Sequence, residues 1–98
     1  MNIQMDAKSL QWFHDELPVK KGDGVRFFVR YGGESTVHPA FSLGVTVESP
    51  TNVATSVTKH NILFFVREED AWYFNGNDLS VVYNPDEEEI QFQVESLH

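Results

Sequence analysis

Hydrophobic residues recur at helical spacing in one segment of the chain, residues 5–18. The recurring positions are Ala7, Leu10, Phe13 and Leu17. Asp6 stands where a side-chain oxygen can accept hydrogen bonds from the first free amides of a helix, and Pro18 ends the pattern. The sequence therefore predicts an N-terminal helix whose apolar stripe packs on a sheet.

Most of the remaining chain alternates between apolar and polar residues, or is rich in β-branched and aromatic residues, as is typical of strands. The predicted strands cover residues 25–31, 41–48, 53–60, 62–67, 79–83 and 90–95. The third and fourth meet near His60 and Asn61 at the spacing of a hairpin. Residues 68–79 are predicted to form a helical turn or an aromatic loop that ends at Asn75-Gly76, a pair suited to positive φ.

The order of these elements predicts an α+β, mainly β fold. We expect one N-terminal helix on a mostly antiparallel β-sandwich of about six strands, because the connections are too short for crossovers. A chain of 98 residues suits a single domain, so residues 1–98 are predicted to share one core.

Composition excludes several kinds of chemistry. The chain has no cysteine, which removes disulfides, thiolate metal sites and cysteine nucleophiles together. Its formal net charge is −8, and all the Lys and Arg residues lie at or before Arg67. This balance opposes binding to nucleic acid and to anionic membranes. No apolar run approaches the roughly 18 residues of a membrane span, so we expect a cytoplasmic protein.

The segment RYGGESTVHPAFSLG, residues 30–44, and the strand before it hold the candidate site residues. The candidates for binding a ligand or a partner are Glu34, Ser35, His38, Arg26 and Arg30. Glu34 and His38 carry ligand types that suit a divalent cation, but a third ligand at diagnostic spacing is missing, so they are weak metal candidates. Arg26 and Arg30 flank Phe28 on one strand face, where they form either an anion-binding patch or, as we favour, cross-strand pairs with acidic residues.

The sequence predicts no catalytic residue. Hydroxyls at Ser35, Thr36 and Ser42 cannot be assigned a His and an acid as a triad from the sequence. The aromatic run Trp72-Tyr73-Phe74 is expected in the core or at an interface rather than as a platform for nucleic-acid bases, because its surroundings are acidic.

Three segments carry a resemblance to a known family. Gly24-Val25-Arg26 and Gly32-Gly33-Glu34-Ser35 resemble the Gly-hydrophobic-Arg strand and the Gly-Gly-Cys-Ser loop of the HesB/IscA-like family, the A-type iron–sulfur assembly proteins. The loop EEDAWYFNG before DLSVVY is similar to a loop of that family. Glu34 stands where the family has its first cysteine, and the C-terminal Cys-Gly-Cys signature has no counterpart.

This resemblance implies a cysteine-free branch of the family, with a HesB-like fold and without the thiolates that a cluster carrier needs. The resulting expectation is a non-catalytic interaction module without a cofactor, monomeric or homodimeric, with a protein partner from iron–sulfur assembly. Two alternatives remain open at this point. One is a metal-handling protein that uses Glu34 and His38, and the other is a small enzyme acting in a sheet cleft.

Overall fold

The computed structural model describes residues 1–32 and 40–95. Its elements in chain order are β1 (Ile3–Met5), α1 (Ala7–Glu16), β2 (Gly24–Tyr31), β3 (Phe41–Glu48), β4 (Val53–Lys59), β5 (Ile62–Arg67), the 3₁₀ helix η1 (Glu68–Tyr73), β6 (Asp78–Asn84) and β7 (Glu89–Glu95). The predicted α+β, mainly β class is confirmed.

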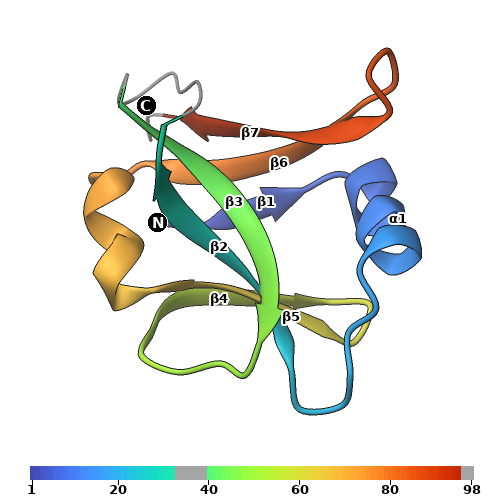
Figure 1. Cartoon of the computed structure of the whole chain (residues 1–98), viewed down its shortest axis with the longest axis horizontal. Coiled ribbons are helices and arrows are strands. Elements are labelled where there is room, and N and C mark those ends of the chain that lie inside the picture. The colour runs from blue at the N-terminus through green and yellow to red at the C-terminus, as the bar shows by residue number, and fades with distance from the viewer. Residues whose placement is uncertain (33–39, 96–98) are drawn as a thin grey trace.

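The strands form two sheets that face each other (Figure 1). One sheet has the order β1-β6-β7, and the other has the order β3-β2-β5-β4. Helix α1 lies at one side of this pair of sheets, and η1 lies at the opposite side. The two helices therefore close the space between the sheets at two of its sides.

The strand pairing is more mixed than the sequence predicted. The hairpin pairs β2–β3, β4–β5 and β6–β7 are antiparallel, as expected from short connections. In addition, β1 pairs with β6 and β2 pairs with β5, both in parallel. These parallel partners are joined through whole hairpins and helices rather than through one crossover, so connection lengths did not reveal them. Strand β1 was missed because three residues are too few to show an alternating pattern.

Helix α1 begins where its sequence predicts, and most of its apolar stripe packs as predicted. The Asp6 carboxylate accepts a hydrogen bond of 2.7 Å from the Ser9 amide. Partial burial alone would raise the pKa of Asp6, but the hydrogen bonds from Ser9 outweigh it and hold that pKa below its ordinary value. Phe13 is fully buried, with its ring 5.1 Å from that of Phe64, whereas Ala7 is exposed.

One hydrophobic core joins both sheets, α1 and η1. Its buried members are Ile3, Leu10, Phe13, Val25, Phe27, Leu43, Phe64, Val66, Tyr73, Phe74, Leu79 and Val81. Val25 and Phe27 face this core as the alternation of β2 predicts. Tyr31 continues the same alternation but is 84% exposed, because it is the last residue of its strand.

Glycines serve two distinct purposes near the ends of β2. At Gly24 a Cβ atom would lie 2.8 Å from the backbone oxygen of Leu63, so the close approach of β2 to β5 requires glycine. Gly32 has a φ of +94°, as expected of a turn after this strand, and its amide donates a 2.7 Å hydrogen bond to Ala40. Gly33, for which a turn was also predicted, lies outside the described residues.

The two predicted tight turns have the expected backbone. His60 and Asn61, between β4 and β5, have φ values of 51° and 63°, which suits a two-residue hairpin turn. Asn75 and Gly76, after η1, have φ values of 49° and 80°.

Candidate functional site

Arg26 lies at the centre of a cluster of ion pairs between the four-stranded sheet and η1. Its Nη1 atom donates to Glu48 Oε1 at 2.9 Å, and its Nη2 atom donates to Asp70 Oδ2 at 2.8 Å. The side chains of Arg26 and Asp70 are only 15% and 7% exposed. Pairing with acidic residues, the interpretation favoured from the sequence, is therefore what Arg26 shows in the structure.

Asp70 also binds the backbone of β2. Its second carboxylate oxygen, Oδ1, accepts a hydrogen bond of 3.2 Å from the Val29 amide. The register between β2 and β5 reaches Arg26 opposite Phe65. Past Arg26 the register with β5 ends, so β5 offers no acceptor to the Val29 amide of β2. Asp70 of η1 supplies that acceptor instead.

Burial and pairing act in opposite directions on the charge of Arg26. Burial alone would lower its pKa, but the hydrogen bonds and the charges of Asp70 and Glu48 outweigh that effect and raise the pKa. Arg26 therefore keeps its positive charge, and the charge keeps η1 fixed against β2 and β3.

A second arginine extends the cluster. Arg67 Nε lies 3.0 Å from Glu69 Oε1, and Arg67 Nη1 lies 3.8 Å from Glu48 Oε2. The contact with Glu69 is an ion pair without hydrogen-bond geometry, and Glu69 is largely exposed, so we assign it little energy.

The 3₁₀ helix that this cluster holds in place presents an exposed tryptophan. Trp72 is 51% exposed, and its ring centroid lies 5.4 Å from that of Phe41. Phe41 in turn lies 5.7 Å from the ring of Tyr31. We call Tyr31, Phe41 and Trp72 the aromatic row. Both ring contacts are edge-to-face, so side chains from β2, β3 and η1 form one continuous surface.

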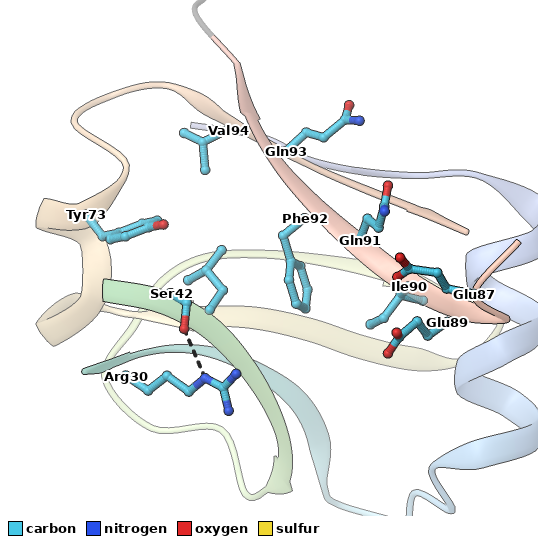
Figure 2. Close-up of a pocket in the computed structure, with 11 residues that line it drawn as sticks. Arg30, Ser42, Tyr73, Glu87, Glu89, Ile90, Gln91, Phe92, Gln93 and Val94 are labelled. Atoms are coloured by element: carbon cyan, nitrogen blue, oxygen red, sulfur yellow. Dashed lines mark hydrogen bonds between the residues drawn. The ribbon is translucent and has the colours of Figure 1, made fainter. Parts of the chain in front are cut away.

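A groove of about 650 Å³ lies between β3 and β7, and we call it the edge groove (Figure 2). Its lining residues are Arg30, Ser42, Leu43, Tyr73, Glu87, Glu89, Ile90, Gln91, Phe92, Gln93 and Val94. Ile90 and Phe92 point from β7 toward the four-stranded sheet, whereas Gln91 and Gln93 point away from it. The floor of the groove is therefore apolar and its rim is polar.

Ser42 fixes the wall of the groove that β3 provides. Its hydroxyl accepts a hydrogen bond of 3.0 Å from Arg30 Nε and donates one of 2.7 Å to the Gly32 backbone oxygen. Since this hydroxyl is buried and both of its roles are occupied, it is placed as a structural group rather than as a nucleophile. Arg30 is exposed beside it.

The structure separates the residues that the sequence grouped as candidates. Arg26 belongs to the ion-pair cluster, whereas Arg30 contacts Ser42 and lines the edge groove. Glu34, Ser35 and His38 lie outside the described residues.

The sequence predicted that the run Trp72-Tyr73-Phe74 lies in the core or at an interface, but it did not identify the aromatic row. The sequence offered two indications of this row. Tyr31 is the last residue of a predicted strand, and Trp72 belongs to an aromatic run that also holds the buried Tyr73. Which member of such a run faces solvent depends on how η1 docks.

Two negative findings apply to residues 1–32 and 40–95. These residues contain no group of three or more His, Cys, Asp or Glu side chains that could hold a metal ion. They also contain no helix with the length and apolar character needed to cross a membrane.

The described residues form a small α+β protein with an exposed aromatic surface beside a groove. The chain is 43% identical over 93 residues to the "Pyruvate dehydrogenase inhibitor" of Bacillus subtilis, an alignment that covers 95% of this chain and 98% of that protein. The chain therefore belongs to the family of this Bacillus subtilis protein.

Other relatives extend the same family. Uncharacterised proteins of Staphylococcus saprophyticus and Staphylococcus haemolyticus are each 33% identical to the chain over 95 residues. Those alignments cover 94% of this chain in both cases, and 97% and 96% of the respective relatives. No family model matches the chain.

These relatives correct the family predicted from the sequence. Membership of the HesB/IscA-like family, and with it a role related to iron–sulfur assembly, is contradicted by the near full-length similarity to a protein named as a pyruvate dehydrogenase inhibitor. The alternatives of a metal-handling protein and a small enzyme are not supported either. The relative is named as an inhibitor rather than as an enzyme, which agrees with the prediction that the chain is not an enzyme.

The residues that carried the mistaken resemblance have structural reasons to be present. Gly24 is required by the approach of β2 to β5, Arg26 by its pairing with Asp70, and Gly32 by its positive φ. Backbone geometry and one ion pair therefore explain the Gly-hydrophobic-Arg strand and the glycine turn that follows it. Neither feature depends on iron–sulfur chemistry.

Proposed function

We propose that the chain is a protein inhibitor of pyruvate dehydrogenase that acts by binding the enzyme. The observation that carries the proposal is the 43% identity, over nearly the whole of both chains, to the Bacillus subtilis protein of that name. Identity at this level and coverage supports a shared binding surface as well as a shared fold. The partner is accordingly a protein, and no covalent step by the inhibitor is required.

The aromatic row is the surface we assign to this binding. Tyrosine and tryptophan are enriched among the residues that dominate protein interfaces, because they offer a large contact area and lose little conformational entropy on binding. Tyr31 and Trp72 are 84% and 51% exposed, and Phe41 joins them into one surface. Scattered apolar residues on a surface are ordinary, whereas three rings from three elements, joined by two ring contacts, are a better candidate for a binding surface.

The ion-pair cluster supports this surface by fixing its position before binding. Asp70 holds η1 against β2 through Arg26 and Val29, and Trp72 follows two residues later on the same 3₁₀ helix. A surface that is already ordered in the free protein loses less conformational entropy on binding. Inhibition is then expected to be stoichiometric and reversible.

The test is a titration of purified pyruvate dehydrogenase from the same cell with the intact chain, following pyruvate-dependent NAD reduction. The rate is expected to fall until the added chain saturates the enzyme, and the two proteins should coelute in size-exclusion chromatography. An undiminished rate with no coelution, at chain concentrations well above that of the enzyme, would refute the proposal.

Several finer expectations from the sequence stay predictions within this proposal. They are a cytoplasmic location, a monomeric or homodimeric state, a single domain over residues 1–98 and the lack of nucleic-acid binding. Of these, the lack of nucleic-acid binding is the one that the formal net charge of −8 supports.

A further inference from the structure

The edge groove lies between strands at the edges of two different sheets. β3 is the last strand of the four-stranded sheet, and β7 is the last strand of the three-stranded sheet. Within the described residues, each of them pairs with a strand on one side only. Backbone donors and acceptors on the unpaired sides can accept an added strand.

The edge of β3 lacks the features that usually protect such an edge. Its first seven residues, FSLGVTV, contain no charge and no proline. The other outer strand of the same sheet, β4, differs, since its pairing is interrupted between Val53 and Thr55 and it ends in Lys59. Bulges and lysines are devices that discourage strand addition, so β3 is the more receptive edge.

The groove also has space and chemistry for an extended peptide. Its volume of about 650 Å³ is in the range of pockets that bind ligands. Leu43 lines the groove from β3, and Ile90, Phe92 and Val94 line it from β7. These side chains provide apolar contacts for alternate side chains of a strand.

The two ends of the edge groove carry side chains of opposite charge. Glu87 and Glu89 lie at the end nearest α1, whereas Arg30 lies beside Ser42, on the side toward η1 (Figure 2). No ion pair of these three residues is found within the described part of the chain. A strand with a basic side chain near Glu87 and Glu89 would match this polarity.

We propose that the edge groove binds an extended segment of the inhibited enzyme as an added β-strand, with a basic side chain of that segment placed at Glu87 and Glu89. This inference rests on the proposed function and names the kind of segment that is recognised. A second copy of the chain is a poorer occupant, because each copy has a formal net charge of −8 and would bring further acidic groups to this end.

The first test is hydrogen exchange of the intact chain, alone and with saturating pyruvate dehydrogenase. Amides of residues 41–48 and 89–95 that point to the free edges should exchange at least about tenfold more slowly in the complex, because an added strand would accept hydrogen bonds from them. Residues 53–59 of β4 serve as the matched control edge and should not change. Equal protection of β4, or no protection of β3 and β7 in a complex that forms, overturns the inference while the proposed function stands.

The second test uses the absence of cysteine from the chain. Gln93→Cys places a single thiol at the rim of the groove, and Ser56→Cys places one at an exposed position of β4. Pyruvate dehydrogenase should slow alkylation of the first thiol and leave the second unchanged. If alkylation of the Gln93→Cys thiol slows with rising chain concentration in the absence of enzyme, the occupant is a second copy and the inference is wrong.

Charge reversal tests the assigned polarity. Glu89→Lys should weaken inhibition by about tenfold or more, whereas Glu16→Lys, an exposed change of the same size on α1, should weaken it much less. Equal effects of the two variants would indicate general steering by net charge and overturn the polarity. If the unaltered chain neither binds nor inhibits the enzyme, the proposed function fails and this inference fails with it.

Discussion

Asp70 binds Arg26 across 44 residues of sequence, with 2.8 Å between the carboxylate Oδ2 and the guanidinium Nη2. The second oxygen of the same carboxylate binds the Val29 amide, so one side chain fixes η1 to both a side chain and the backbone of β2. The pair holds η1 against β2, and Trp72 lies two residues after Asp70 on the same 3₁₀ helix, so the pair links the stability of the fold to the position of Trp72.

Replacing Asp70 with alanine should destabilise the protein by about 2–4 kcal/mol. The substitution leaves the buried Arg26 charge with fewer partners and the Val29 amide without its acceptor. Glu69→Ala is the matched control, since Glu69 is 58% exposed, and its cost should stay within about 0.5 kcal/mol. Urea unfolding of both variants measures the two losses of stability. Equal losses would show that the ion pair between Arg26 and Asp70 contributes no more than the exposed contacts of Glu69.

Gly24→Ala should cost about 1–3 kcal/mol, because its Cβ would lie 2.8 Å from the Leu63 backbone oxygen and the two strands would have to separate. Gly44→Ala provides the comparison. There the nearest atom is Phe28 Cζ at 2.7 Å, at the far end of a side chain that can rotate. Thermal unfolding should rank Gly24→Ala as the more destabilising change, and the reverse order would mean that the ring of Phe28 is the less movable neighbour.

The sequence was sufficient for features that depend on local pattern. The Asp6 cap, the burial of Leu10 and Phe13 and the hairpin turn at His60-Asn61 all follow from residues within a few positions of one another. Such features are set by backbone propensity and by the face on which apolar residues fall.

The remaining features depend on pairings between distant segments. The parallel pairing of β2 with β5, the acceptor role of Asp70 toward Val29 and the meeting of β3 with β7 have no local signature. The resemblance built on Gly24-Val25-Arg26 was wrong for a related reason. Glycine and arginine were interpreted as a family motif, whereas a close strand approach and a buried ion pair account for them.

Stability should depend on pH through Asp6 in a predictable direction. The folded-state pKa of this carboxyl is lowered, so its contribution is present above its unfolded-state pKa and is lost as the pH falls through the folded-state value. Asp6→Ala should therefore cost about 1 kcal/mol at pH 7, and less as the pH falls through the folded-state pKa and the carboxyl of the parent chain becomes protonated. Asp6→Asn keeps a side-chain oxygen and should stay close to the parent at pH 7, which separates capping from charge. A constant difference between the Asp6→Ala variant and the parent across this pH range would contradict the assignment.

Trp72→Ala should weaken inhibition of pyruvate dehydrogenase strongly while changing stability little. Trp72 is 51% exposed, so its loss removes contact area from the aromatic row and little from the core, and a tryptophan at the centre of an interface is worth about 2 kcal/mol or more. That corresponds to a rise of about thirtyfold in the chain concentration needed for half-inhibition.

Val53→Ala is the matched control, because Val53 is an exposed apolar residue on β4, outside the aromatic row and the edge groove. Titrations of the two variants, with thermal unfolding alongside, test the assignment. Equal inhibition by both would remove the aromatic row from the binding surface, whereas a large loss of stability in Trp72→Ala would indicate that the ring mainly holds η1 in place.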